Sequence, residues 1–198
     1  MHIFRECAKT IGIMDAKKIV HIQKKLTGPV VLIGLMGAGK TRMGMILSGA
    51  LSMAFTDADD VIVDRAGMSI SDIFEKCGEP HFRALEAAVM DDLLSRGTGV
   101  ISPGGGAVMT PATADKIFSE NVVSVWLDAP IDVLAERVSR NKNRPLVAGG
   151  DLKTKLTQLM KVRGPVYGRA TLRVDNGART LDDTLEDILS ALYTHLTP

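Results

Sequence analysis

A glycine-rich stretch followed by lysine and threonine is the part of this sequence most clearly arranged for chemistry. It runs GLMGAGKT over residues 34–41 and fits the pattern G-x-x-x-x-G-K-[ST]. In that pattern backbone N–H groups surround phosphate oxygens, Lys40 reaches the β- and γ-phosphates, and Thr41 offers a hydroxyl to Mg²⁺. An apolar run precedes the stretch and an amphipathic segment follows it, as the pattern requires. It predicts a nucleotide phosphate site, which motors, switches and kinases all use.

Three acids, Asp57, Asp59 and Asp60, follow the second apolar run. Ligands of parallel sheets bind beyond the carboxyl ends of the strands, and we expect this strand to lie beside the first. Asp57 and Asp59 then project in similar directions, so that one can hold a water of a Mg²⁺ shell while the other faces an acceptor hydroxyl. Asp60 is expected to cap the next helix. The alternative is that all three acids only cap this helix.

Basic residues further along the chain suit anionic ligands. Arg83 stands three residues before Glu86, a spacing that places both on one helical face and can fix the guanidinium for a carboxylate. The same spacing is common in solvated ion pairs. Arg144 lies in a polar, glycine-bearing stretch, 140–151, which predicts a mobile loop able to bring an arginine to a transferring phosphoryl group. His81 is expected to have a surface or packing role.

A second glycine run, Gly104 to Gly106, closes a third apolar run. Adjacent glycines are costly in conformational entropy. We therefore expect a turn at the end of a strand, without side chains so that the backbone can approach both an acceptor and the γ-phosphate end of ATP.

These residues are carried by short β-branched runs that alternate with longer amphipathic stretches. The alternation predicts an α/β fold with one doubly wound, five-stranded parallel sheet. The expected strands are residues 29–33, 53–57, 99–102, 121–127 and 171–174. The expected helices are about 40–51, 60–66, 78–96, 111–119, 130–140, 151–161 and 181–194.

Composition narrows the class of protein. The chain has 198 residues, 45% of them hydrophobic, which is enough for one substantial core. Its 24 basic and 23 acidic side chains argue against a nucleic-acid surface, and no apolar run approaches the about 18 residues of a membrane span. Cys7 and Cys77 lack metal-ligand spacing and are expected to be free thiols in the reducing cytoplasm. Without heptads or repeats, a monomer is expected.

The first 28 residues differ from the rest and are expected to form a basic extension to a single domain at 29–198. They carry six basic and two acidic side chains. Their apolar residues lie loosely at helical spacing, which suits a helix packed on the domain or on a partner. A continuous apolar segment of the kind found in secretory signals is missing.

Taken together, the motifs resemble shikimate kinase over essentially all of residues 29–195. GLMGAGKT, TDADD, GEPHFRALE, ISPGGGAV, NRPLVAG and RGPVY occur in that order and at fitting separations. The resemblance implies a P-loop NTPase-type three-layer sandwich like that of nucleoside monophosphate kinases. It also implies transfer of the γ-phosphoryl group of ATP to the 3-hydroxyl of shikimate, giving shikimate 3-phosphate and ADP on the route to chorismate and the aromatic amino acids.

The resemblance also assigns residues. Asp59 would bind the acceptor hydroxyls and serve as base, and Asp57 would hold Mg²⁺ through water together with Thr41. The catalytic residues would be Lys40, Asp59 and Arg144, the last from a lid at about 140–151. The ATP-binding residues would be Gly37, Ala38, Gly39, Lys40, Thr41, Arg42, Arg137 and Arg144, with Arg137 against adenine. The shikimate-binding residues would be Asp59, Arg83, Gly105 and Arg163, the two arginines clamping the carboxylate.

Two other functions fit part of the pattern. One is another small-molecule P-loop kinase, such as a gluconate or nucleoside monophosphate kinase; two arginines with an acid favour a carboxylated polyol instead. The other is a nucleotide-binding regulatory module without turnover, against which the presence of all the proposed catalytic and clamp residues speaks. Arg42 and Pro80 depart from the family pattern and are expected at helix starts, where both are tolerated.

Overall fold

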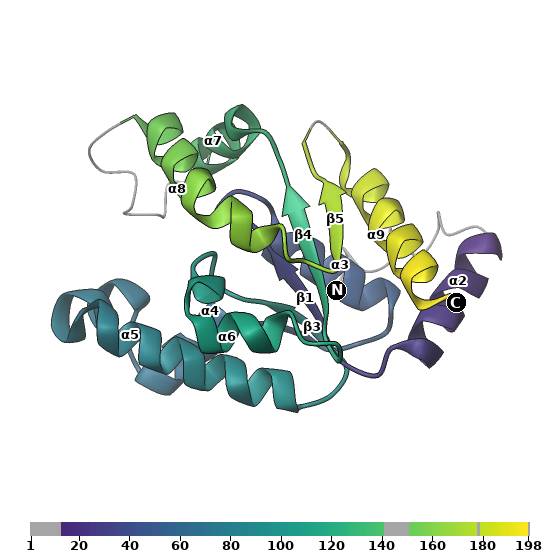
Figure 1. The fold of residues 1–198 in the computed structure, drawn as a ribbon, viewed down its shortest axis with the longest axis horizontal. Coiled ribbons are helices and arrows are strands. Elements are labelled where there is room, and N and C mark those ends of the chain that lie inside the picture. Colours follow the sequence, from purple (N-terminus) through teal and green to yellow (C-terminus); the bar gives the residue numbers. More distant parts are fainter. Residues whose placement is uncertain (1–12, 141–150, 178, 198) are drawn as a thin grey trace.

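The computed structural model describes residues 13–140, 151–177 and 179–197, and it contains one parallel sheet with helices on both sides (Figure 1). The strands are β1 (Val30–Ile33), β2 (Phe55–Asp57), β3 (Val100–Ser102), β4 (Val123–Asp128) and β5 (Leu172–Asp175), in the order β2-β3-β1-β4-β5. The helices are α2 (Ile13–Lys25), α3 (Lys40–Ala50), α4 (Ala58–Ala66), α5 (Ile70–Ser95), the 3-10 helix η1 (Ala107–Met109), α6 (Pro111–Ile117), α7 (Ile131–Arg140), α8 (Leu152–Tyr167) and α9 (Leu181–Leu196). The predicted five-stranded α/β sandwich is confirmed.

The order of the strands corrects one expectation. β2 does not lie beside β1, because β3 pairs with both of them and separates them. The three residues of β3 are buried, whereas the three residues of β2, FTD, are only partly buried. The more apolar strand therefore takes the interior position, and β2 forms an edge. As a result, the turns that follow β1 and β3 are neighbours.

Helix α5 is longer than predicted and is kinked. Its backbone leaves helical geometry at Gly78, with φ 81° and ψ 167°. Pro80 therefore lies in the first turn of the second segment, where its missing N–H costs nothing. That second segment matches the predicted helix 78–96. The first segment, which was not predicted, begins at Ile70, and the side chain of its N-cap Ser69 accepts a hydrogen bond from the backbone N–H of Asp72.

Helix α8 also extends beyond its predicted end at residue 161. It continues through Gly164 and Pro165 to Tyr167. A glycine-proline pair usually indicates the end of a helix. Here Tyr167 is fully buried, with its ring centroid 5.9 Å from that of Trp126 on β4. Burial of this ring stabilises the last turn and places RGPVY on the helix.

Helix α2 lies along α9 at one end of the molecule (Figure 1). Ile19 and Ile22 of α2 are part of the buried core. The Nζ of Lys18 donates a hydrogen bond to the Oγ of Ser190 on α9, 3.4 Å away. The helical segment of the basic extension thus packs on the domain.

Several expectations concern residues outside the described part of the chain. They include Cys7 and the predicted lid with Arg144, which falls in residues 141–150. Cys77 is an exposed free thiol, and His81 is exposed, as expected. In the ranges that the structure describes, no helix is long and apolar enough to cross a membrane.

Candidate active site

The first glycine run forms a tight loop between β1 and α3. Gly37 and Gly39 adopt left-handed conformations, with φ of 83° and 79°, and Gly39 directly precedes the first residue of α3. The loop therefore presents the free N–H groups at the start of the helix, where an anion is stabilised. The Nζ of Lys40 donates to the backbone oxygen of Gly34 at 3.1 Å, so its side chain folds back over the loop. This is the geometry of a phosphate-binding loop.

A hydroxyl and a carboxylate meet at the start of α3. The Oγ1 of Thr41 donates to Oδ2 of Asp57, 2.7 Å away, at the end of β2. Oδ1 of the same carboxylate accepts from the backbone N–H of Asp59 at 3.1 Å. Asp57, and not Asp60 as expected, is thus the N-cap of α4. Because the cap fixes the first turn of α4, it also fixes the backbone that carries Asp59.

The second glycine run makes contact with functional groups on three sides. A Cβ placed on Gly104 would lie 2.9 Å from Oε1 of Glu86 and 3.0 Å from Oδ1 of Asp59. Real Cβ atoms essentially never show the first distance and rarely show the second, so both acids occupy space that a side chain at this position would need. The glycine lets two carboxyl groups from α4 and α5 lie against one turn.

The other two glycines of this run contact the phosphate loop and the arginines. A Cβ on Gly105 would lie 3.3 Å from the backbone oxygen of Gly34 and 3.5 Å from Nη1 of Arg163. A Cβ on Gly106 would lie 2.9 Å from Nη1 of Arg83. The turn after β3 therefore brings together the phosphate loop, the acids and both arginines.

Glu86 is the buried acid of the site. Its side chain is 2% exposed, and Oε2 accepts from Nη1 of Arg83 at 2.7 Å. Within the described residues Oε1 has no hydrogen-bond partner. Burial raises the pKa of Glu86, and the nearby charge of Asp59 adds to this, while Arg83 and Arg163 oppose it.

Arg83 is held by acids on both sides. Its Nε and Nη2 donate to Oε1 of Glu79 at 3.2 and 3.1 Å, and Nη1 donates to Glu86. Burial opposes its charged form, but the hydrogen bonds and charges of Glu86 and Glu79 outweigh it and raise the pKa of Arg83. The guanidinium is therefore fixed and cationic, and two of its five N–H groups stay available to a ligand.

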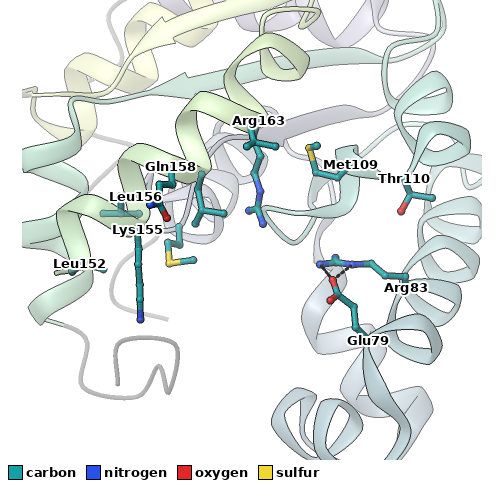
Figure 2. A pocket seen from close by; sticks show the side chains of 12 residues that line it. Glu79, Arg83, Met109, Thr110, Leu152, Lys155, Leu156, Gln158 and Arg163 are labelled. Atoms are coloured by element: carbon teal, nitrogen blue, oxygen red, sulfur yellow. Dashed lines mark hydrogen bonds and ion pairs between the residues drawn. The ribbon is translucent and has the colours of Figure 1, made fainter. Parts of the chain in front are cut away.

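A pocket of about 710 Å³ lies between α5 and α8. In Figure 2, Arg83 and Arg163 extend from these two helices toward one another across it. The wall from α8 is largely apolar but also contains Lys155. The lining residues are Met36, Glu79, Arg83, Met109, Thr110, Leu152, Lys155, Leu156, Gln158, Leu159, Val162 and Arg163. Two converging arginines in a partly apolar pocket suit a small molecule with a carboxylate.

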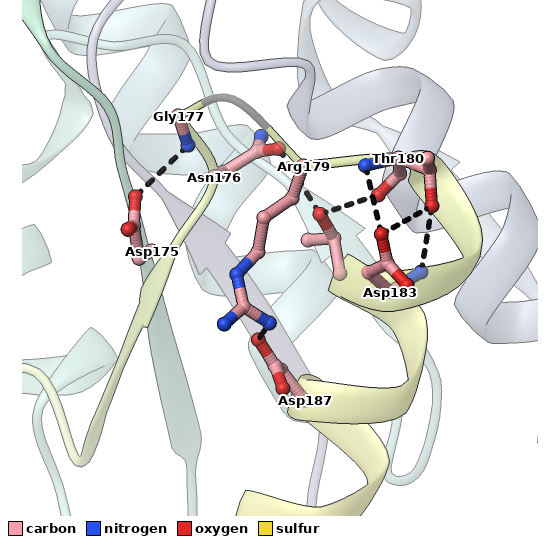
Figure 3. A network of polar contacts seen from close by, with 8 residues as sticks. Asp175, Asn176, Gly177, Arg179, Thr180, Asp183 and Asp187 are labelled. Atoms are coloured by element: carbon pink, nitrogen blue, oxygen red, sulfur yellow. Dashed lines mark hydrogen bonds and ion pairs between the residues drawn. The ribbon is translucent and has the colours of Figure 1, made fainter.

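A buried amide just after β5, Asn176, connects the phosphate loop to the start of α9, and Figure 3 shows its polar network on the α9 side. Nδ2 of Asn176 donates to the backbone oxygen of Ala38, and its Oδ1 accepts from Oγ1 of Thr184 at 3.3 Å. Arg137 donates through Nη2 to the backbone oxygen of Gly177 at 2.9 Å. Arg137 thus braces this segment, and Arg42 is exposed in the first turn of α3.

Sequence reasoning missed several of these groups. Glu86 was considered only as a partner of Arg83, although its place on the buried face of an amphipathic helix signals an acid that needs a partner. Asn176 follows the last strand at the ligand-binding edge of the sheet, which was a usable signal. Glu79 stands four residues before Arg83 within the predicted helix 78–96, and this i,i+4 spacing was a usable signal for their ion pair.

Comparisons with known proteins agree on one family. A sequence model described as shikimate kinase matches residues 36–193. Shikimate kinase of Novosphingobium aromaticivorans is 39% identical over 185 residues, covering 91% of this chain and 95% of that protein. Shikimate kinase of Caulobacter vibrioides is 44% identical over 163 residues, covering 82% of this chain and 81% of that protein.

Solved structures give the same result. Shikimate kinase from Acinetobacter baumannii in complex with shikimate superposes with a TM-score of 0.83 at 31% identity, covering 90% of this chain and 99% of that one. A gluconokinase from Sinorhizobium meliloti superposes with a TM-score of 0.56 at 21% identity, covering 85% of this chain and 93% of that one. The second similarity concerns the fold alone.

Proposed function

This chain belongs to the shikimate kinase family, and we propose that the turn after β3 is the centre of its active site. The chain phosphorylates the 3-hydroxyl of shikimate with ATP, giving shikimate 3-phosphate and ADP in aromatic amino acid biosynthesis. The observation that supports this location is that Gly104, Gly105 and Gly106 contact the acids, the phosphate loop and the arginines at once.

The acceptor is bound by two cations and a backbone group. Arg83 and Arg163 pair with the carboxylate of shikimate from opposite walls of the pocket, since a guanidinium matches a carboxylate in geometry and charge. Gly105 offers its backbone N–H to the same molecule. Asp59 binds the ring hydroxyls, because its carboxylate lies at the same turn.

Transfer then moves one phosphoryl group and one proton. The 3-hydroxyl oxygen forms a bond to the γ-phosphorus as the bond between that phosphorus and the β-γ bridging oxygen breaks. Asp59 takes the proton of the hydroxyl. Lys40 and Arg144 neutralise the charge that develops on the phosphate oxygens; Arg144 has this role from the sequence, since it lies outside the described residues.

ATP lies along the phosphate loop. Its phosphates contact the backbone from Gly37 to Gly39 together with Lys40 and Thr41, and Arg42 adds a cation at the start of α3. Arg137 lies beside adenine. Its hydrogen bond to the backbone oxygen of Gly177 holds the segment after β5 next to it.

Thr41 and Asp57 fit a hydrated Mg²⁺, because their hydroxyl and carboxylate oxygens already lie 2.7 Å apart and Mg²⁺ prefers oxygen ligands. The ion would be held by Thr41 and, through water, by Asp57, and it would neutralise phosphate charge. In the described ranges no group of three or more His, Cys, Asp or Glu side chains gathers as a protein-only cage. A site completed by water and phosphate oxygens is consistent with that.

We further propose that the enzyme is a cytoplasmic monomer that acts on ATP and shikimate without a nucleic-acid or membrane partner. The balanced charge supports this, as does the lack of heptad or repeat patterns in the sequence.

The substrate proposal is tested by ADP release with shikimate, gluconate and nucleoside monophosphates as acceptors. We expect turnover with shikimate alone. Turnover with gluconate and none with shikimate would show that the two arginines serve another acid.

The role of Asp59 is tested by Asp59→Asn with Asp60→Asn as the matched control. We expect kcat to fall about 100-fold or more in Asp59→Asn, in the range that general-base catalysis contributes, with ATP binding largely kept. Asp60 is exposed in the same helical turn and its variant should retain activity. Equal activities of the two variants would refute the role.

A further inference from the structure

Tyr167 links the helix that carries Arg163 to the second glycine run. It lies in the last turn of α8 and is fully buried. Its Oη donates a hydrogen bond to the backbone oxygen of Gly105 at 2.6 Å, across 62 residues of sequence. Removing this hydroxyl would leave a carbonyl in the turn without the donor that now satisfies it.

Arg163 lies one helical turn before Tyr167, so the two side chains are on the same face of α8. The positive charge of Arg163 acts on the phenol, and Nη1 of Arg163 lies 3.5 Å from the Cβ position of Gly105. A carbonyl only accepts and a guanidinium only donates. The single proton of the phenol therefore goes to Gly105, and the lone pairs of its oxygen remain available to the nearby charge of Arg163.

The surroundings of Tyr167 fix its ring in place and keep its hydroxyl protonated. Its ring contacts Trp126 in the core, and Arg173 covers the indole at 4.7 Å. Burial raises the pKa of Tyr167, with Arg163 acting against it. The hydroxyl thus remains a donor at the pH at which proteins work.

We propose that Tyr167 is a positioning residue for the acceptor, whose hydroxyl fixes the Gly105 peptide and the Arg163 guanidinium relative to each other. The inference rests on the proposed function, in which these two groups bind shikimate. It predicts that the hydroxyl contributes to the binding of shikimate and hardly to the binding of ATP.

The test compares Tyr167→Phe with Tyr193→Phe, which changes the only other tyrosine of the sequence. Tyr193, on α9, packs against His21 of α2, with 5.0 Å between ring centroids, and is a matched control. For Tyr167→Phe we expect KM for shikimate to rise about 10-fold, the effect of one lost buried hydrogen bond. We expect kcat to change less than about 3-fold and KM for ATP to stay constant, and Tyr193→Phe to match the wild type in all three.

Hydrogen-deuterium exchange of residues 104–109 gives a measurement independent of turnover. We expect the amides of residues 104–109 to exchange faster in Tyr167→Phe than in the wild type, and at the wild-type rate in Tyr193→Phe. If both variants bind shikimate equally well, or if KM for ATP rises as much as KM for shikimate, the positioning role is overturned.

The two proposals fail in different ways. Absence of shikimate turnover by the wild-type protein would overturn the proposed function. The exchange measurement can still be made on such a protein. Exchange at the wild-type rate in Tyr167→Phe would overturn the role of Tyr167 in fixing the turn, whereas faster exchange would support that role.

Discussion

The two glycine runs follow neighbouring strands of the sheet, and both lack space for side chains, but only the first also needs left-handed dihedral angles. In the first run, Gly37 and Gly39 have left-handed φ angles that other residues rarely adopt. In the second run, none of Gly104 to Gly106 has a left-handed φ. There the reason is space alone, since side chains from α4 and α5 and the backbone oxygen of Gly34 lie 2.9–3.3 Å from the Cβ positions.

The difference shows how each half of the site is determined. The proposed donor half lies in one continuous segment, whose dihedral angles shape the loop. The acceptor half is assembled from segments far apart in the sequence that converge on one turn. That the second run lets the backbone approach both substrates stays a prediction, and the structure adds that protein side chains also lie against this turn.

The largest effect is expected from Gly37→Ala. A methyl group would lie 2.9 Å from the backbone oxygen of Leu134 and from Cγ2 of Val138 on α7. That overlap adds to a cost of roughly 1–2 kcal/mol for the left-handed conformation. We expect kcat/KM for ATP to fall at least about 100-fold in steady-state assays.

Gly67→Ala is the control for that prediction. Gly67 also has a left-handed φ, 63°, but no atom lies within 4 Å of its Cβ position. The variant should lower Tm slightly and keep full activity. If Gly37→Ala had the ATP kinetics of the wild type, the first run would not need glycine to shape the phosphate loop, and the contrast with the second run would be lost.

A smaller and different effect is expected from Gly104→Ala. The methyl group would displace Glu86 and Asp59 without changing the phosphate loop. We expect kcat with shikimate to fall about 10-fold, one tenfold step for each 1.36 kcal/mol of barrier, with KM for ATP unchanged. Gly99→Ala is the control, since its nearest neighbour is 3.4 Å from the Cβ position. A loss of ATP affinity in Gly104→Ala would contradict the separation of donor and acceptor halves.

The smallest effect concerns the pH dependence of stability on the acceptor side. Because the pKa of Glu86 is raised above its ordinary value of 4.5, its favourable contribution is complete below that value and is lost as pH rises through the pKa of the folded state. Glu86→Gln lacks this titration. The free energy of unfolding of the wild type minus that of the variant should therefore decrease with rising pH in urea unfolding from about pH 4 to 8. A constant difference would show that Glu86 does not titrate differently in the folded protein.

Much of the fold follows from local patterns. The strands at 30–33 and 123–128 are buried on both faces and are nearly continuous in apolar residues, which made them predictable. The place of β2 was wrong, since strand order depends on how buried each strand becomes among its neighbours. The end of α8 was wrong for a similar reason: packing of Tyr167 outweighs the local preference of Gly164 and Pro165.

The sequence by itself determined the phosphate loop, the parallel sheet and the family, because each rests on residues that are close together along the chain or on motifs at fitting separations. Only the tertiary structure decided what Glu86, Tyr167 and the glycines at 104–106 contact. These contacts join α4, α5, α8 and the phosphate loop across long stretches of sequence. A pairwise contact between distant segments leaves no periodic signal in either one, so it appears only when the core brings them together.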